Sequence, residues 1–546
     1  MPAAVDTWAL CDRIARRFAK SKYCYESGED YLPEGSLDDL ITEAEISKQL
    51  SQSLAFLRSP EKEREFIKFV SQNAKKVFAI ATLGKIGGEK VYRAVNDLQI
   101  TDEKLPIDAT DALLVELLGR WDAEQFGEHQ WKFLAPVFNE NILVYHLDKR
   151  HILPLMDVGS RPRRGTFGLV SKVKIHEAHQ KHRGVILGGL HLAVKEIVAQ
   201  KIASGAGQSG LDEVKREWQN KAKALDRLSE VKHQNLVPCI AAIGKKDKYY
   251  FLFPWADGGS LQDFWEKFRN PILSPEFVGK VLVQIRGLAE ALKILHNYRG
   301  RAANFRQGVN SDNDGSEGDG IRHGGLKPEN ILRFAPQGDN DIGTLKIADL
   351  GLAKYHDASV LLEKNARGTN FGAARYEEPE VTALRLEIPA LSCLYDMWSM
   401  GCIILELLIW LLHGTDKLQE FKNAIGRRDL NRGSSYCVIE ENHWGAVAKV
   451  HDVVANYIKT LAEYPACAAN TALGDLLSVV ETKLLVVELP PPKEKGQDGL
   501  ISVTAAESTK TNSGPYRASA SSLLESLDDI IRKCTDQVGY LCTERD

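Results

Sequence analysis

The stretch "RHGGLKPENIL", residues 322 to 332, decides how the rest of the chain is interpreted. It holds two adjacent glycines, then a lysine and an asparagine three residues apart, and an apolar ending typical of a strand. Three further stretches follow in order, namely "LKIADLGLAK" (345 to 354), "GAARYEEPE" (372 to 380) and "DMWSMGCIILEL" (396 to 407). Each is weak evidence alone, and their order and spacing are more informative than any one of them.

Upstream, strand-like runs carry residues suited to a phosphate-bearing ligand. In "RRGTFGLV" (163 to 170), Gly165 and Gly168 would let a turning backbone approach phosphates closely, with Val170 packing under a flat ring. In "HLAVKEI", Lys195 is centred in an apolar strand, where a lysine is costly unless it meets an anion. Taken alone, the two glycines equally fit an ordinary hairpin, and Lys195 equally fits an edge-strand lysine that points to solvent.

The composition is that of a folded globular protein. The chain has 546 residues, 44% of them hydrophobic and 26% charged, and its length suggests roughly two to four domains. The net charge of -4 gives no basic signature, so we expect no nucleic-acid partner. The apolar stretch 401 to 412 is too short to cross a bilayer and predicts a buried helix, so we expect no membrane partner.

The ends and the cysteines suggest a location. The N-terminal residues are charged where a secretory signal needs an apolar run. The nine cysteines form no CxxC pair, which argues against structural zinc and favours a reduced compartment. We therefore expect a cytoplasmic or nuclear protein.

The apolar pattern divides the chain into regions. Residues 1 to 145 are mostly helical in pattern, with apolar residues three and four apart in 36 to 57 and in 59 to 80, and an apolar plug at 130 to 138. This region shows no catalytic constellation. We interpret it as a helical module that packs on its neighbour or on a partner.

The rest of the chain changes character twice. Residues 150 to 256 predict short strands around a helix at 211 to 231, and residues 257 to 535 predict helices with one strand pair near 330 to 348. Two polar, low-complexity stretches predict flexible surface insertions, and they are residues 299 to 320 and 490 to 515.

Together these stretches resemble a eukaryotic protein kinase domain over residues 150 to 535. The resemblance implies an α+β fold with two lobes, a small β-rich N-lobe and a large α-helical C-lobe, preceded here by an α-helical N-terminal domain. It implies ATP and Mg²⁺ as cofactors, and a protein substrate or protein partner. The N-terminal helical region, "FPWADGG" and the catalytic-loop stretch at 322 to 332 together look most like a group of kinase-domain proteins common in filamentous fungi.

The resemblance also implies roles for single residues around the nucleotide. Lys195 matches the lysine that holds the α and β phosphates and pairs with a glutamate on the next helix. The usual helical spacing lands at Lys221, with Glu217 one turn and Glu213 two turns earlier, so we assign Glu217. Residues 254 to 256 would bind adenine through backbone hydrogen bonds. The other residues implied to line the site are Gly165, Gly168, Val170, Ala193, Phe253, Trp255 and Ala256.

In the large lobe, the resemblance implies metal ligands and structural contacts. Asp349 of "ADLG" would bind Mg²⁺, and Asn330, which with Lys327 matches the catalytic loop, would hold a second metal ion. Glu380 would pair with Arg517, and Asp396 would accept hydrogen bonds from the backbone of the catalytic loop. These matches predict a large lobe built in the usual way.

The chain departs from the family at four positions. Gly325 replaces the aspartate that positions the substrate hydroxyl and accepts its proton, and Gly324 replaces the arginine that anchors a phosphorylated activation segment. Ala373 replaces the threonine that contacts the missing aspartate, and Arg163 stands where the first loop glycine is usual. Losing a positioned base costs roughly a hundred- to ten-thousand-fold in rate.

Three functions remain open on this reading. One is a slow Ser/Thr protein kinase, for which the carboxylates at 312, 314, 317 and 319 could supply a substitute base. The second is a pseudokinase that binds Mg-ATP and acts as a switch or scaffold, which the paired loss at Gly325 and Ala373 favours. A small-molecule kinase is a third alternative, and "YEEPE" counts against it. Because Gly324 removes the usual arginine, we predict little activation by phosphorylation at Ser359 or Thr369.

Overall fold

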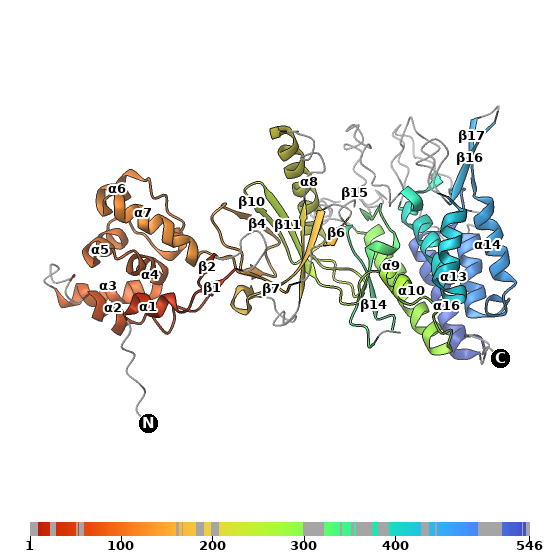
Figure 1. The fold of residues 1–546 in the computed structure, drawn as a ribbon, viewed down its shortest axis with the longest axis horizontal. Helices are drawn as coiled ribbons and strands as arrows, with labels where there is room; N and C mark the ends of the chain where they lie inside the picture. Colours follow the sequence, from red (N-terminus) through yellow and green to blue (C-terminus); the bar gives the residue numbers. More distant parts are fainter. Residues whose placement is uncertain are drawn as a thin grey trace, which may run out of the picture. The chain divides into compact units, whose positions relative to one another are not determined.

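The computed structural model describes residues 9–21, 29–50, 53, 59–159, 163–165, 168–181, 191–197, 207–298, 321–338, 341–350, 354–355, 374–379, 393–426, 436–442, 445–489, 516–537 and 539–541. The chain divides into two compact units, one made of Met1–Trp218 with Cys239–Trp255 and the other of Gln219–Pro238 with Ala256–Asp546. Figure 1 shows the course of the chain through both units.

The first unit begins with helices that share one core. The core includes Ile46 on the second helix, Val70 on the third and Ile80 on the fourth. Local sequence explains where the third helix begins, because Ser59 accepts the N–H of Lys62 and a proline occupies the first helical position. The helices are α1 (Leu10–Ala15), α2 (Glu43–Leu50), α3 (Pro60–Asn73), α4 (Lys75–Leu83), α5 (Gly88–Asn96), α6 (Ala112–Leu118) and α7 (Arg120–His129).

The helices predicted at 36 to 57 and 59 to 80 are shorter than their apolar patterns. Within the first range the described helix is α2 alone. The second range is split, because the backbone leaves the helical conformation at Ala74 (φ -142°). The carboxylate of Asp102 then accepts the N–H groups of Lys76 and Val77 at 3.1 and 3.0 Å, which caps the start of α4. Because this cap comes from a distant residue, the local pattern could not reveal it.

A 7-stranded sheet forms the rest of the first unit. Its order is β4-β10-β11-β9-β7-β5, with β6 also paired to β7, and β4 is parallel to β10 while the other pairs are antiparallel. The strands are β4 (Val144–Leu147), β5 (Leu155–Asp157), β6 (Arg163–Gly165), β7 (Gly168–Ile175), β9 (Leu192–Ile197), β10 (Ala241–Lys245) and β11 (Lys248–Pro254). Strand β4 arises at the end of the N-terminal region, so that region completes one edge of the sheet.

A buried histidine joins the helical region to the loops beside the sheet. The Nε2 of His179 accepts the N–H of Glu34 at 3.3 Å, so its Nδ1 carries the proton and donates to the carbonyl of Pro136 at 3.1 Å. The ring of Tyr31 meets His179 edge-on, with centroids 5.3 Å apart. Short strand pairs flank this contact, and they are β1 (Ala19–Lys20) with β2 (Asp30–Tyr31) and β3 (Phe138–Asn139) with β8 (Gln180–Lys181).

The helix predicted at 211 to 231 is α8 (Gly207–Leu228). Its Trp218 is buried and lies close to the sheet at Gly244 of β10, where a Cβ would come within 3.0 Å of the indole ring. Trp218 also contacts the rings of Tyr249 and of His146, a residue of β4, with centroids 5.2 and 5.6 Å away. The packing of Trp218 against the sheet therefore sets the orientation of this part of α8.

The second unit is mainly helical, and its sheet content is limited to short pairs among the described residues. Its helices are α9 (Leu261–Lys267), α10 (Pro275–His296), α13 (Leu394–Ala424), α14 (Asp452–Ala462), α15 (Ala472–Val479) and α16 (Ala520–Asp536). Its strand pairs are β12 (Ile321–Arg322) with β15 (Lys354–Tyr355), β13 (Ile331–Phe334) with β14 (Thr344–Ile347), and β16 (Cys437–Asn442) with β17 (Gly445–Val450). The pair predicted near 330 to 348 is β13 with β14. The β-rich first unit and helical second unit give the predicted α+β fold.

The apolar stretch 401 to 412 lies in α13, as a buried helix. Gly414, with φ 81° and ψ -177°, interrupts the helical backbone near the middle. By length and composition α13 is the one helix in the described part of the chain that could cross a membrane. However, 94% of its most apolar window is buried inside the protein, as in the core helix of a globular fold.

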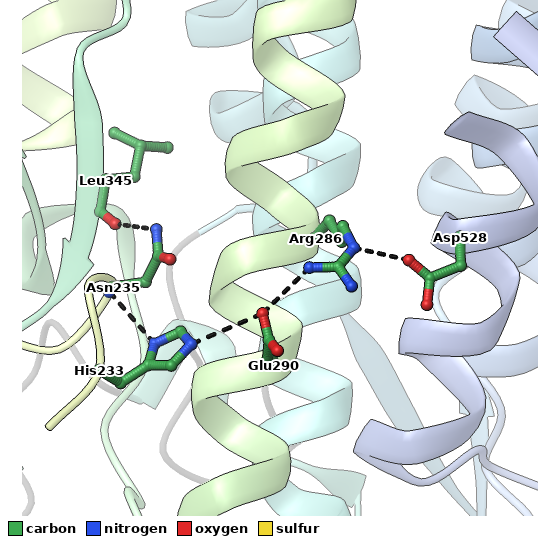
Figure 2. Close-up of polar contacts among 6 residues, drawn as sticks. All are labelled: His233, Asn235, Arg286, Glu290, Leu345 and Asp528. Carbon is green, nitrogen blue, oxygen red and sulfur yellow. Dashed lines mark hydrogen bonds and ion pairs between the residues drawn. The ribbon is translucent and has the colours of Figure 1, made fainter. Parts of the chain in front are cut away.

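Residues 233 to 237 are attached firmly to the second unit (Figure 2). Asn235 donates its side-chain N–H to the carbonyl of Leu345 at 2.7 Å, and its backbone carbonyl accepts the N–H of Ile347 at 2.8 Å. A Cβ at Gly287 would lie only 2.3 Å from Asn235 Oδ1, so glycine lets α10 pass close to this loop.

Figure 2 also shows a line of charged groups that crosses α10. The Nε2 of His233 lies 3.6 Å from a carboxylate oxygen of Glu290. Arg286 donates to Glu290 at 3.0 Å and to Asp528 of α16 at 2.6 Å. These groups link the 233–237 loop and α16 through the surface of α10.

Candidate active site

The strand β9 places two predicted residues on one face of the sheet. It lies between β7 and β11, with Lys195 directly opposite Val170 and Phe251, and Ala193 directly opposite Phe253. Directly opposed residues of antiparallel strands project to the same side. The structure thus brings together four of the residues predicted for the nucleotide site, namely Val170, Ala193, Lys195 and Phe253.

The two faces of β9 differ in burial. Leu192 and Val194 point into the apolar core of the sheet, whereas Ala193 and Lys195 are half-buried on the other face. Because β9 has a neighbour on each side, the alternative of an edge-strand lysine is wrong.

The predicted glycine hairpin is the turn between β6 and β7. Gly165 is paired with Gly168, and Arg163 with Val170. The two glycines therefore form the last described pair of β6 and β7. The contact of these glycines with phosphates stays a prediction. The alternative, an ordinary hairpin without a ligand, also stays open.

Residues 254 to 256 follow β11 and were predicted to bind adenine. The N–H of Trp255 donates to the carbonyl of His191 at 3.0 Å, and the ring of Trp255 lies 5.2 Å from the Lys172 amine. The carbonyl of Ala256 accepts the N–H of Gly259 at 3.1 Å. Since the Trp255 N–H is already bonded, an adenine at this segment would use other backbone groups.

Glu217 lies on α8 one residue before the buried Trp218, and it is half-buried. Its side chain is thus on a helix whose orientation the sheet sets. The pairing of Glu217 with Lys195 stays a prediction.

In the second unit, side chains of the catalytic loop itself hold its backbone at the position of Gly325. Asn330 donates its side-chain N–H to the carbonyl of Gly325 at 2.8 Å. His323 accepts the N–H of Gly325 at its Nδ1, at 3.2 Å, so its Nε2 carries the proton and donates to the carbonyl of Ala348 at 2.9 Å. The backbone at 325 is thus fixed from two sides, without any contribution from a side chain there.

Asp396 anchors the loop from the start of α13, as predicted. Its carboxylate accepts the N–H groups of His323 and Gly324 at 2.8 and 2.9 Å, and it lies 2.9 Å from His296 Nε2. The side chain is fully buried. Burial alone would raise the pKa of Asp396, but the hydrogen bond and charge of His296, with His323 and the Gly324 N–H, outweigh it and lower the pKa.

The predicted metal ligands are brought together by the loop. The N–H of Ala348 donates to the carbonyl of Asn330 at 2.8 Å, so both backbone groups of Ala348 are bound by loop residues. The next residue, Asp349, has a φ of 62°, a left-handed conformation that is uncommon outside glycine. A strained backbone that the surroundings hold in place is typical of functional sites.

The two glycines of the loop differ in conformation. Gly324 has a φ of 69°, where a side chain would be strained, whereas Gly325 lies outside this left-handed region. Gly325 and Lys327 are both buried. The φ angle at position 325 therefore does not require glycine, and its lost side chain is a chemical difference.

The predicted ion pair between Arg517 and Glu380 stays a prediction, and Arg517 has a second acid beside it. Arg517 is buried and lies 3.2 Å from Glu378, and it also donates to the carbonyl of Val486 at 2.8 Å. The predicted partner Glu380 lies outside the described residues. So do Ala373, the phosphorylation candidates Ser359 and Thr369, and the four carboxylates of the 299 to 320 insertion.

Sequence reasoning missed a buried network around Glu406. This carboxylate, fully buried in α13, accepts the hydroxyl groups of Tyr376 and Tyr436 at 3.0 and 2.8 Å and lies 3.1 Å from the Lys422 amine. It ties the end of the activation segment to α13 and to the residue before β16. The available signal was the position of Glu406 inside an apolar run, since a buried carboxylate needs partners.

Comparison with known proteins agrees with this geometry. The protein kinase domain family matches residues 165–463, which is more than half of the chain. The serine/threonine-protein kinase ULK1 of Homo sapiens is 27% identical over 252 residues, 45% of this chain and 18% of that protein. The serine/threonine-protein kinase ATG1c of Arabidopsis thaliana is 25% identical over 276 residues, 50% of this chain and 30% of that protein.

A shorter relative gives the same picture. A serine/threonine-protein kinase H1 homolog of Pinctada fucata is 28% identical over 222 residues, 40% of this chain and 43% of that protein. The match thus spans 18% to 43% of these three relatives. The chain belongs to the protein kinase family, with Ser/Thr kinases among its relatives.

Proposed function

We propose that the chain binds Mg-ATP and transfers phosphate to protein Ser or Thr hydroxyls weakly or not at all. The observation that carries this proposal is the state of Gly325. Its backbone carbonyl accepts the Asn330 amide and its N–H is bound by His323, so the backbone of the loop is held in place at this position. No side chain extends from this position to accept the proton of a hydroxyl nucleophile.

The face around Lys195 supports nucleotide binding. A half-buried lysine in a central strand gives its face a positive charge, and a phosphate group is a ligand that suits such a charge. Beside it, the small Ala193 lies between Lys172 and Phe253 in the register of the sheet, which leaves room for a flat ring above Ala193. This arrangement favours a nucleotide over a purely anionic ligand.

The donor set fits Mg²⁺ when it arrives with the nucleotide. Asn330 uses its N–H for Gly325, and its Oδ1 accepts no hydrogen bond from the described residues. With the carboxylate of Asp349 it would offer the oxygen ligands that a hard cation prefers. No group of three or more His, Cys, Asp or Glu side chains in the described part of the chain could hold a metal alone. Bound Mg²⁺ would neutralise charge on the phosphates.

The missing carboxylate limits the reaction rather than the binding. Lys195 would orient the phosphates, and phosphoryl transfer depends largely on such positioning. Without a base at 325, the hydroxyl of the substrate is neither oriented nor deprotonated by the loop. A loss of roughly a hundred- to ten-thousand-fold in rate is expected from this change alone.

The test compares transfer and binding in four forms of the full chain. Transfer of the γ-phosphate to the chain itself and to a generic Ser/Thr substrate would be measured for the wild type, Gly325→Asp, Lys195→Met and Asp349→Asn, with Mg-ATP binding followed by thermal shift. We expect wild-type binding with little or no transfer, and faster transfer in Gly325→Asp. Failure of the wild type to bind Mg-ATP would contradict the proposal.

A second candidate function is a pseudokinase that acts as a scaffold or switch through its N-terminal helices. The observation that favours it is the helical core of α1 to α7, which is separate from the core of the sheet yet joined to it by β4 and His179. Transfer below detection in Gly325→Asp as well would support this alternative. Under either function we propose a protein substrate or partner and a cytoplasmic or nuclear location.

A further inference from the structure

Arg322 is a buried cation that the proposed function does not use. It lies in β12, directly before His323 of the catalytic loop, and its side chain is only 6% exposed. Two of its guanidinium nitrogens, Nε and Nη1, are buried and have no hydrogen-bond partner among the described residues. Burying a guanidinium whose N–H groups make no hydrogen bond costs free energy of folding. A ligand that accepts hydrogen bonds from these groups would offset that cost.

The surroundings of Arg322 are known from the residues that it contacts. Its guanidinium lies over the ring of Tyr395 at 4.9 Å from the centroid, which covers one side of the cation. Its strand pairs with β15, where Arg322 is opposite Lys354 in the segment that follows Asp349. Arg322 also acts electrostatically on Cys393 and Tyr395, although burial dominates and raises the pKa of both groups.

The nearby carboxylates that could neutralise Arg322 are largely engaged elsewhere. Asp396 is held by His296 and by two N–H groups of the loop, and Glu378 pairs with Arg517. Glu377 acts electrostatically on Tyr395, as do Glu378, Asp396 and Arg322, so it is a third carboxylate in the surroundings of this ring. No ion pair joins Arg322 to any of these groups in the described structure.

From these observations we infer that Arg322 forms an anion site that takes a phosphate group. A guanidinium donates two parallel N–H bonds to a phosphate or carboxylate along its Nε–Nη2 edge or its Nη1–Nη2 edge, so each of the two buried nitrogens of Arg322 can supply one arm of such a fork. Charge-assisted bonds of this kind are strong when water is excluded. A phosphate fits better than a carboxylate because its greater charge offsets more of the desolvation of the buried cation. The proposed site does not take part in phosphoryl transfer. Arg322 lies two residues before Gly324, the position at which the arginine usual in the family is replaced by glycine.

The test uses the full chain and inorganic phosphate as the probe. The Tm would be measured against phosphate concentration at constant ionic strength, with chloride as the reference, in the wild type, Arg322→Met, Arg322→Lys and the surface control Arg532→Met. We expect phosphate to raise the Tm of the wild type and of Arg532→Met by about 2 °C or more, and to leave the Tm of Arg322→Met unchanged. An equal rise in Arg322→Met would overturn the assignment.

Two further variants keep the test decisive. Arg322→Lys keeps the charge but loses the fork, so its rise should be smaller, and an undiminished rise would overturn the bidentate site. This variant also serves if Arg322→Met does not fold. Lys195→Met reports binding at the nucleotide face instead, and loss of the rise in Lys195→Met with its retention in Arg322→Met would place the anion there and overturn the inference.

A separate experiment distinguishes two sources of the phosphate, a phosphorylated residue of this chain and free inorganic phosphate. The purified chain would be treated with a phosphatase and then supplied with inorganic phosphate. A fall in the Tm of the wild type, absent in Arg322→Met and reversed by added phosphate, would assign the site to a phosphorylated residue of this chain. An unchanged Tm after phosphatase, with the rise on added phosphate intact, would assign it to a free phosphate.

Discussion

The sheet around Lys195 and the loop around Gly325 match the protein kinase family in different ways, the sheet through its side chains and the loop through its backbone contacts. On the sheet, the side chains are retained, and Val170, Ala193, Lys195 and Phe253 share one face. In the loop, the side chains at two positions are reduced to glycine, while the backbone remains held by Asn330, His323 and Asp396. The comparison teaches that the shape of a catalytic loop and its chemistry are encoded by separate residues.

The largest effect expected is on the loop side, at Asp396. Asp396→Ala would leave two N–H groups of the loop and His296 without their buried acceptor, so it should lower the free energy of unfolding by about 3–5 kcal/mol. Urea unfolding of the variant beside wild type would measure it, with Asp529→Ala, at a side chain 61% exposed, as a control near zero. A loss below about 1 kcal/mol would mean that Asp396 does not set the loop shape.

A second prediction concerns the support of the sheet at His179. Burial lowers the pKa of this histidine from 6.5 to about 4, and the bond accepted from Glu34 requires the neutral ring. The unfolded chain therefore binds a proton that the folded chain excludes. Stability should be full above pH 6.5 and fall as the pH drops toward 4, by about 2 kcal/mol between pH 7 and pH 5.

The pH profile would be measured by urea unfolding at both values in wild type and in His179→Gln. The variant should show less of this fall, because its side chain does not titrate. Of the neighbouring groups, Lys76 and His176 oppose protonation of His179, and Glu34 favours it. Identical pH profiles for the two proteins would remove His179 as the support of this contact.

A smaller effect on stability is expected when the two glycines of the loop are replaced by alanine, and it differs between them. Gly324→Ala places a side chain at a φ of 69° and should cost about 1–2 kcal/mol. Gly325→Ala avoids that conformation and should cost clearly less, while both changes restrict the unfolded chain equally. Thermal unfolding of the two variants side by side measures the difference. Equal costs would contradict the distinction between a conformational and a chemical glycine.

The smallest effect lies outside both regions, at the surface of α10. Asp528 is 49% exposed and binds Arg286, so Asp528→Ala should cost less than about 1 kcal/mol. Urea unfolding at low and high salt would check this, because a surface ion pair weakens as salt screens it. A cost above about 2 kcal/mol would show that the charged line across α10 contributes more than a surface pair.

Much of this fold could be predicted because its signals are local. The apolar run around Lys195 predicted a strand, and in the structure its register places Ala193 on the same face as Lys195. The family resemblance at Asp396 predicted its contact with the loop. Both depend on residues close in sequence or on a motif with fixed partners. The helix predicted at 211 to 231 is also a local feature, and the structure forms it as α8.

The features that sequence could not supply depend on distant partners. Asp102 caps α4 from across the module, β4 joins the edge of β10, and Arg517 pairs with Glu378. The unpaired state of Arg322 is of the same kind, since it follows from what its neighbours bind. No short stretch of sequence contains both partners of any of these contacts. The roles of the candidate site residues are tested by the binding experiments.

The pairing of β4 with β10 has a consequence for how the protein can be shortened. A chain that begins at residue 150 would lose β4 and, with His146, one of the rings against Trp218. The edge of β10 would then expose a row of unpaired N–H and carbonyl groups, which invites other molecules to add strands and aggregate. The N-terminal segment thus protects solubility as well as geometry, and a soluble kinase-like fragment should begin before residue 138.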